Sequence, residues 1–450
     1  MNDDARTPPR LIDRATAPLQ RFLELEAAST ILLLAASVAA LVWANSPWAA
    51  SYDALLHVPL ALRLGPWELE LSLHHFVNDA LMGLFFFVVG LEIKRELAIG
   101  ELSSLGRALL PVIAAVGGMV VPAGIYAAFH LDGHALRGWG IPMATDIAFA
   151  VAALSVFGAR VPSGLKIFLL ALAIADDIGA VSVIALFYTE ETSIPWLALA
   201  GAGLAFTWAL NVAGVRAYSV YFLVGGLVWL ATYHSGVHAT IAAVALGFLT
   251  PARPLDPLPV RRSFVTSGLG LLERFGDLIE GEGDHDGHVR HRLARQVSRA
   301  ARSTLSPLDE LTNLLHPWVA FFVMPLFALC NAGVAIDAST LAEPVPQRVA
   351  LGVALGLVIG KPIGITLFTW LAVQLRLAEL PRGVGWSHVV ATGFLAGIGF
   401  TVALFVASLA FQAPSYVAGA KVGILTGSVL ATGLGVFLLH RTLPPAPSPP

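Results

Sequence analysis

The chain has 450 residues, of which 56% are hydrophobic and only 13% are charged, and its mean hydropathy is +0.76. Soluble domains carry about 25% charged residues. This composition therefore excludes an ordinary soluble enzyme or nucleic-acid-binding protein and indicates a chain that is surrounded by lipid. The net charge of −3 indicates no particular partner, and the single cysteine, Cys330, excludes an internal disulfide. The first thirty residues lack the apolar core and small-residue cleavage site of a cleaved signal peptide.

Apolar runs long enough to cross a bilayer recur along the whole chain. A spanning helix needs roughly 20 apolar residues, and we expect an all-α polytopic membrane protein with about twelve transmembrane helices. The predicted spans lie near residues 28–45, 76–93, 108–129, 141–158, 164–188, 195–213, 217–232, 236–250, 315–335, 348–373, 388–411 and 418–440.

The basic residues agree with this map of the spans. One set of connecting segments holds 22 of the Lys and Arg residues, and the opposite set holds only four, Arg63, Arg137, Arg348 and Lys421. Lys361 is the basic residue that this map leaves inside a span. Because basic residues gather on the cytoplasmic side of a membrane, both termini are predicted to be cytoplasmic.

The segments outside the spans complete the predicted domain layout. Residues 1–27 form a cytoplasmic N-terminal segment, 28–250 hold spans 1–8, and 308–441 hold spans 9–12. Residues 58–73 alternate apolar and polar side chains about a Gly-Pro turn, which predicts an external β-hairpin. Residues 251–307 read as a charged cytoplasmic loop, and the Pro-rich stretch 442–450 as a disordered tail.

Two adjacent carboxylates, Asp176 and Asp177, lie near the middle of the predicted fifth span, with no other charge for about ten residues on either side. An ionisable group at this depth is costly and is therefore a functional hypothesis. Neighbouring residues on a helix point about 100° apart, so at least one carboxylate must face a hydrated cavity or a cation. Such a pair can hold either protons or a metal cation; a structural hydrogen-bonded pair is the alternative.

Two further ionisable groups fall within predicted spans. Asp146 follows Thr145 in the fourth span, four residues after Pro142, which tends to break the helix. A freed carbonyl and the Thr145 hydroxyl can help to hold a cation, although Asp146 can also be a simple helix cap. Lys361 lies in the tenth span, where a buried lysine can lose its proton; a lysine that extends to the membrane surface is the alternative.

The eleventh span contains Gly397 and Gly399 just before Thr401. These glycines permit either an unwound middle or close packing of intact helices. The stretch 145–157 of the fourth span loosely matches 401–411 of the eleventh, and the two spans run in opposite directions on our map. A weak inverted repeat, interrupted by Gly or Pro in each copy, indicates the midplane site of a secondary transporter.

Seven ordered segments together resemble the NhaA-type sodium/proton antiporters, a family in which such inverted repeats occur. They run from the second to the eleventh span and include polar residues within the membrane. The segments are Asn78–Leu97, Ala144–Phe149, Ala173–Gly179, Ser235–Thr240, His316–Val319, Gly360–Ile365 and Gly397–Thr401.

The resemblance implies the following roles. Spans 4 and 11 are discontinuous helices that cross at mid-membrane, and Asp176 and Asp177 carry the cation and the protons, with Thr145 at the ion site. Asp146 and Lys361 balance the charges of the helix ends at the crossing, and Lys361 also pairs with Asp176. The remaining roles are a cytoplasmic funnel lined by Asp79, Glu92 and Glu96, a broken-helix region at Gly397, Gly399 and Thr401, and a homodimer contact through hairpin 58–73.

The sequence also departs from the family pattern. The connection 251–307 looks longer than usual, and Thr312 and Asn313 stand where the family tends to have acidic and histidine residues tied to its pH response. We therefore leave the pH-activation profile open, whereas the predicted transport site is unaffected.

From the residues and this resemblance we expect electrogenic exchange of Na⁺ or Li⁺ for protons by alternating access in a bacterial inner membrane. No cofactor is expected beyond the transported ions, and no enzymatic activity. Two other classes stay open: a sodium-coupled symporter of an organic solute, which needs a larger polar cavity, and a passive cation channel, which shows no coupling to pH.

Overall fold

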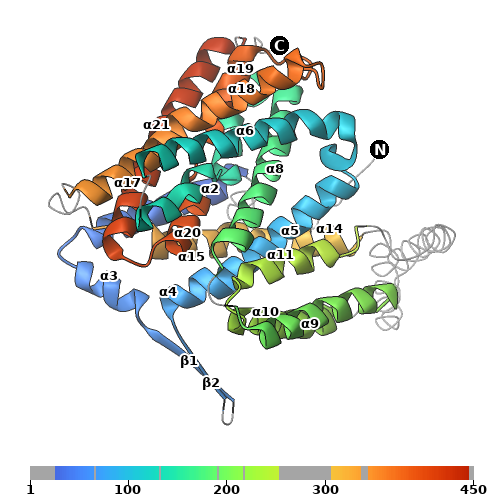
Figure 1. Cartoon of the computed structure of the whole chain (residues 1–450), viewed down its shortest axis with the longest axis vertical. Coiled ribbons are helices and arrows are strands. Elements are labelled where there is room, and N and C mark those ends of the chain that lie inside the picture. Colours follow the sequence, from blue (N-terminus) through green and yellow to red (C-terminus); the bar gives the residue numbers. More distant parts are fainter. Residues whose placement is uncertain are drawn as a thin grey trace, which may run out of the picture. The chain divides into compact units, whose positions relative to one another are not determined.

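The structure is a computed structural model that describes residues 26–64, 67–130, 133–189, 192–215, 218–252, 306–335 and 343–444. Most of the predicted N-terminal segment 1–27, of the charged loop 251–307 and of the tail 442–450 lies outside these residues. The described residues are almost entirely helical, as the sequence predicts, and they form two compact units (Figure 1).

The first unit contains the described residues up to Phe85, those of Ser104–Thr189 and those from Trp318 onward. Its early elements are α2 (Glu26–Ala44), α3 (Ala49–Leu56), strands β1 (Pro59–Leu64) and β2 (Trp67–Ser72), α4 (Leu73–His75), the π-helical turn η1 (Phe76–Leu81) and the start of α5 (Met82–Ala98). Then follow α6 (Leu105–Phe129), the 3₁₀ segment η3 (His134–Met143), α7 (Ile147–Ser155), the 3₁₀ turn η4 (Gly158–Arg160) and α8 (Ser163–Phe187). The late elements are η5 (Val319–Val323, π), α15 (Met324–Asn331), α17 (Pro344–Leu355), η6 (Gly356–Gly360, π), α18 (Lys361–Gln374), α19 (Trp386–Ala396), α20 (Phe400–Ala410) and α21 (Pro414–Thr442).

The second unit contains the described residues of Phe86–Ser103 and Glu190–Pro317. Besides the end of α5 it holds the 3₁₀ turn η2 (Glu101–Ser103), α9 (Ile194–Val212), α10 (Tyr218–His234), α11 (Ala239–Leu249) and most of α14 (Pro307–Trp318). Helices α9, α10 and α11 pack together.

Eight helices among the described residues are long and apolar enough to cross a membrane, or up to ten if each of two bent pairs counts as one span. The bent pairs are Ala28–Ala44 with Ala49–Leu56 and Trp386–Ala396 with Phe400–Ala410. Two shorter apolar helices, Val220–His234 and Ala239–Leu249, coincide with the predicted seventh and eighth spans. The number twelve therefore stays a prediction, whereas a multi-pass membrane protein follows from these helices.

Helix α21 begins at Pro414, four residues before the predicted start of the twelfth span at residue 418, and it contains Lys421. Proline suits the first turn of a helix because its missing N–H has no intrahelical partner there. The helix therefore begins before the apolar run that a hydropathy pattern detects, and Lys421 Nζ donates to the carbonyl oxygen of Gly333, 3.3 Å away.

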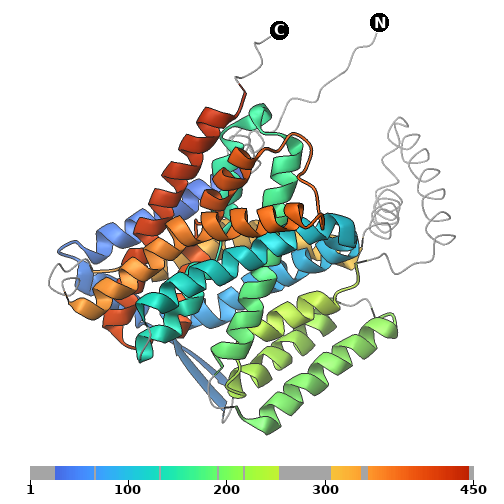
Figure 2. The same ribbon diagram turned by 45° about the horizontal axis from the view of Figure 1, so that its top comes forward.

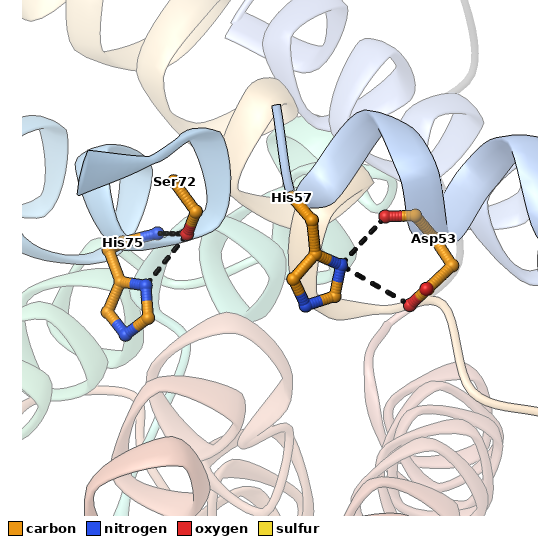
Figure 3. A network of polar contacts seen from close by, with 4 residues as sticks. All are labelled: Asp53, His57, Ser72 and His75. Carbon is orange, nitrogen blue, oxygen red and sulfur yellow. Dashed lines mark hydrogen bonds and ion pairs between the residues drawn. The ribbon is translucent and has the colours of Figure 1, made fainter. Parts of the chain in front are cut away.

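Strands β1 and β2 pair antiparallel, with Pro59 opposite Ser72 and Leu64 opposite Trp67. Two short polar networks flank the open end of this pair (Figure 3). At the end of α3, the ring Nδ1 of His57 lies 2.8 Å from the carbonyl oxygen of Asp53. After β2, the Ser72 hydroxyl accepts from the backbone N–H of His75 and lies 2.7 Å from the Nδ1 of that ring.

Helix α18 lies directly against α6, and α17 also contacts α6; in Figures 1 and 2 these helices run side by side. Gly117 and Gly364 make this approach possible, because a Cβ added at Gly364 would lie 2.1 Å from the carbonyl oxygen of Gly117. Small residues at a helix interface let two backbones come close in lipid. This packing holds Lys361, the first residue of α18, inside the first unit.

Candidate functional site

The helical path of the predicted fourth span is interrupted between Met143 and Ile147. Residues 134–143 form the 3₁₀ segment η3, and Ala144 and Asp146 are extended, with ψ angles of 144° and 100°. The backbone N–H of Asp146 donates to the carbonyl oxygen of Ile398, 2.6 Å away. The helical run begins at His134, seven residues before the predicted start, and Pro142 lies inside it, one residue before its end.

A second interruption separates α19 from α20 at residues 397–399, where the two helices are bent by 48°. A Cβ added at Gly397 would lie 2.4 Å from the carbonyl oxygen of Leu357, and one at Gly399 would lie 3.1 Å from that of Ala144. Only glycine leaves room at position 397, whereas at position 399 a Cβ would require its neighbours to shift slightly. The two interrupted segments therefore lie against each other, although they are about 250 residues apart in the sequence.

Asp146 caps two helices at this contact. Its Oδ1 accepts from the backbone N–H of Phe149 in the first turn of α7, at 3.2 Å. Its Oδ2 accepts from the backbone N–H of Thr401 in the first turn of α20, at 3.1 Å, and from the Thr401 hydroxyl. The N-terminus of a helix carries a partial positive charge, so one carboxylate stabilises two such ends. Asp146 is thus a helix cap, which is the alternative that the sequence analysis left open. It caps α20 in addition to α7.

Lys361 and Asp176 form a buried ion pair beside this contact. Their side chains are 0% and 1% exposed, and Lys361 Nζ lies 2.7 Å from Asp176 Oδ2. The same ammonium donates to the Thr145 hydroxyl at 2.8 Å, and that hydroxyl donates to the carbonyl oxygen of Ala396 at 2.8 Å. Oδ1 of Asp176 is buried and has no hydrogen-bond partner among the described residues. Lys361 therefore does not extend to the membrane surface.

Asp177 is the next residue of α8 and is also buried, at 8% exposure. Its charge interacts with that of Lys361. The structure therefore brings Asp176, Asp177, Thr145 and Lys361 into one buried cluster, although they come from three separate segments of the chain. It places Asp146 and Thr401 at the adjoining helix ends.

Two features of the cluster escaped the sequence analysis. Ser428 of α21 accepts from the backbone N–H of Phe400 at 3.3 Å, so it caps α20 together with Asp146; a serine in a glycine-rich span gives no local signal of that role. The turn η6, just before Lys361, is π-helical. Such turns insert an extra residue into a helix and are frequent at functional sites.

Comparison with known proteins identifies the family of the chain. The family model described as Na⁺/H⁺ antiporter 1 matches residues 20–439. An NhaA Na⁺/H⁺ antiporter of Sorangium cellulosum is 48% identical over 95% of this chain and 91% of its own length. Another, from Rhodopirellula baltica, is 46% identical over 96% of each chain. The chain belongs to the NhaA family of Na⁺/H⁺ antiporters. A solved sodium/proton antiporter of Methanocaldococcus jannaschii, MjNhaP1, aligns with 96% of this chain and 93% of its own at 15% identity and a TM-score of 0.45.

The predicted funnel residues of this NhaA family member are divided between the two units. Asp79 lies in η1 of the first unit, whereas Glu92 and Glu96 lie on the part of α5 that belongs to the second. Glu96 Oε2 accepts from the backbone N–H of Glu101 at 2.9 Å. A shared funnel therefore stays a prediction.

Thr312 and Asn313, at the positions that the resemblance ties to a pH response, lie on α14. Thr312 is buried and Asn313 is exposed on α14. In the same helix Asp309 pairs with Arg95 of α5, with 3.7 Å between the Nε of Arg95 and Oδ1 of Asp309.

Proposed function

We propose that this protein exchanges Na⁺ or Li⁺ for protons and that Asp176 and Asp177 bind the cation and the protons in turn. One observation carries the proposal: Asp176 is fully buried, is paired with Lys361 through Oδ2, and keeps Oδ1 without a partner among the described residues. A buried carboxylate oxygen that lacks a partner is costly, and a bound cation or proton would satisfy it. The names of the family relatives support the same activity.

The chemistry of the cluster suits a small alkali cation. Na⁺ is a hard cation and prefers oxygen ligands, which the carboxylates of Asp176 and Asp177 and the Thr145 hydroxyl supply. Lys361 competes for Asp176 because it already forms an ion pair with it at 2.7 Å. Binding of a cation therefore has to displace either the lysine or a proton, and this competition couples the two ions.

We propose that the exchange is electrogenic. If both acids, or one acid and Lys361, release a proton for each Na⁺ that binds, then one more positive charge moves in one direction than in the other. Membrane potential acts on that charge with about 2.3 kcal/mol per 100 mV, so the potential can drive sodium out of the cell.

The transport cycle follows alternating access in this proposal. The segments around Ala144 and Gly397 act as the interrupted middles of two inversely related spans that cross near the midplane of a twelve-span bundle, with both termini cytoplasmic in the bacterial inner membrane. Asp146 and Lys361 balance the charges of the helix ends. Support comes from the hydrogen bond between Asp146 and Ile398 and from the capping of α7 and α20 by Asp146.

Two further parts of the proposal concern access and assembly. Asp79, Glu92 and Glu96 line the cytoplasmic approach to the site.

Two copies of the chain form a homodimer through the hairpin of β1 and β2. The two strands pair only with each other among the described residues, and a strand edge without a partner is a template for pairing.

The test is the sodium-dependent collapse of a pH gradient in proteoliposomes. Wild-type protein should dissipate the gradient when Na⁺ or Li⁺ is added, and Asp177→Asn should abolish this response because the amide can neither bind a proton nor neutralise the cation. Asp53→Asn, an exposed carboxylate at the end of α3, is the matched control and should transport normally. Retained exchange at similar affinity in Asp177→Asn would contradict the assignment. In the same vesicles an imposed potential should change the rate only if the exchange is electrogenic.

A further inference from the structure

The 3₁₀ segment η3 is ten residues long, from His134 to Met143. Runs of 3₁₀ helix longer than three or four residues are uncommon because their hydrogen-bond geometry is poor. A segment of this length therefore depends on partners outside itself, and two tyrosines supply them.

Tyr188, directly after α8, makes two hydrogen bonds to η3 through one hydroxyl. The hydroxyl donates to the carbonyl oxygen of Arg137 at 2.7 Å and accepts from the backbone N–H of Gly140 at 3.2 Å. Tyr126 of α6 adds a third bond, because its hydroxyl donates to the carbonyl oxygen of Ala135 at 2.8 Å.

The contact at Gly140 is close. A Cβ added at Gly140 would lie 2.7 Å from the Tyr188 hydroxyl oxygen and 3.2 Å from a ring carbon of the same side chain. Any larger residue at position 140 must therefore displace the hydroxyl, so Gly140 and Tyr188 form a matched pair.

These bonds connect the two segments that supply the proposed cation ligands. Helix α8 carries Asp176 and Asp177 and ends immediately before Tyr188, whereas η3 leads, through the extended Ala144, to Thr145 and Asp146. A displacement of η3 relative to α8 would move the Thr145 hydroxyl relative to the Asp176 carboxylate.

We propose that Tyr188, with help from Tyr126, is a positioning residue for the cation site. Its hydroxyl holds η3 so that Thr145 and Asp176 reach a common cation. The inference rests on the proposed function, since it assumes that these residues bind the cation. Functional groups have to be held within about 0.5 Å of their productive geometry. Loss of the hydrogen bonds between the Tyr188 hydroxyl and η3 therefore lowers the affinity for the cation more than it lowers the maximal rate.

The experiment compares variants in the proteoliposome assay, with the apparent KM for Na⁺ and the maximal rate measured separately. Tyr188→Phe keeps the ring and removes both bonds. Gly140→Ala displaces the hydroxyl by a different route. Tyr221→Phe is the matched control, because that hydroxyl also has two hydrogen-bond partners, Asn211 and Val215, but lies in the second unit.

We expect Tyr188→Phe and Gly140→Ala each to raise the apparent KM about three- to tenfold, as the loss of one or two hydrogen bonds predicts. The maximal rate should stay within about twofold of wild type. The double variant should be no worse than Tyr188→Phe alone, because the alanine no longer meets a hydroxyl. A purely structural role would instead lower the maximal rate at an unchanged KM.

Three results would overturn the inference. Tyr188→Phe could have the same KM as Tyr221→Phe, the maximal rate alone could fall, or the effects of the two single variants could multiply in the double variant. If wild-type vesicles show no sodium-dependent proton movement, the proposed function fails and the inference fails with it. Normal wild-type exchange with an unchanged KM in Tyr188→Phe refutes the inference alone.

Discussion

At the scale of single residues, the site depends on charges that are fully buried and have specific partners. Removing one partner of a buried ion pair costs about 3–5 kcal/mol, because the other charge is left uncompensated. Asp176 and Lys361 can therefore separate only when a proton or a cation takes the place of the missing partner. Asp146 is held differently, by backbone N–H groups of α7 and α20 and by the Thr401 hydroxyl. This difference supports the proposed exchange at Asp176 and a static role for Asp146.

The burial of a single residue, His130, predicts how the stability of the protein depends on pH. The residue follows α6, is 6% exposed and stacks on the Tyr126 ring at a centroid distance of 4.4 Å. Its Nδ1 donates to the carbonyl oxygen of Tyr126 at 3.0 Å, and its buried Nε2 has no partner among the described residues. Burial lowers the pKa of His130 below its usual value, and the charge of Arg348 lowers the pKa further.

Because the folded state binds this proton less readily than the unfolded state, the stability should be greatest above the ordinary histidine pKa of about 6.5 and should fall as the pH drops through that value. Thermal unfolding of purified protein between pH 8 and pH 5 measures the effect. The decrease in Tm should be smaller in His130→Gln, which cannot be protonated, and an identical decrease in both proteins would show that other groups cause it.

At the scale of elements, the two interruptions are the features that set the site apart from an ordinary helix bundle. Each exposes backbone groups that a continuous helix would satisfy itself, and in lipid such groups need other partners. Asp146, Ile398 and Ser428 supply these partners. The interruptions can therefore persist inside the protein, and they place helix ends next to the buried ion pair.

The close approach at Gly397 can be tested by substitution. Gly397→Ala would place a Cβ 2.4 Å from the Leu357 carbonyl oxygen, and overpacking of this kind costs typically about 1–3 kcal/mol. We expect a lower Tm and a loss of most transport, since the backbone that shifts also carries Thr401. Gly433→Ala is the control, because a Cβ there meets nothing within 4 Å and alanine favours a helix by about 1 kcal/mol. Equal behaviour of the two variants would show that the break tolerates a side chain.

At the scale of the whole molecule, the proposed homodimer forms through the hairpin of β1 and β2. A two-stranded sheet on its own is at best marginally stable in water. A second copy that pairs with one strand edge would stabilise it, and the exposed residues Val58 and Leu60 would be covered in the process. The hairpin joins the first unit at His57 and Leu73, so its removal leaves the helices intact.

We therefore expect a variant in which a short Gly-Ser linker replaces residues 60–71 to be a monomer. The linker can be short because Pro59 and Ser72 are directly opposite each other in the register. Light scattering of the purified protein in detergent measures the mass, and transport per protomer should be retained because the proposed cation site is not altered. His57→Ala, which changes only the polar network of Figure 3, should remain a dimer. A dimeric hairpin-free variant would place the interface elsewhere.

The sequence alone was enough to identify a multi-pass membrane protein, the family and the ionisable residues within the spans, because hydropathy, charge and short motifs are local properties. It did not reveal that α21 begins at Pro414, because a helix can begin before its apolar run does. The resemblance implied the pairing of Lys361 with Asp176. Only the tertiary structure decided the other contacts: Lys361 with Thr145, Asp146 with Phe149 and Thr401, Ser428 with Phe400, and Tyr188 with η3. Several of these partners are 185 to 255 residues apart in the sequence. Their contacts depend on how whole helices pack, and no local pattern encodes that packing.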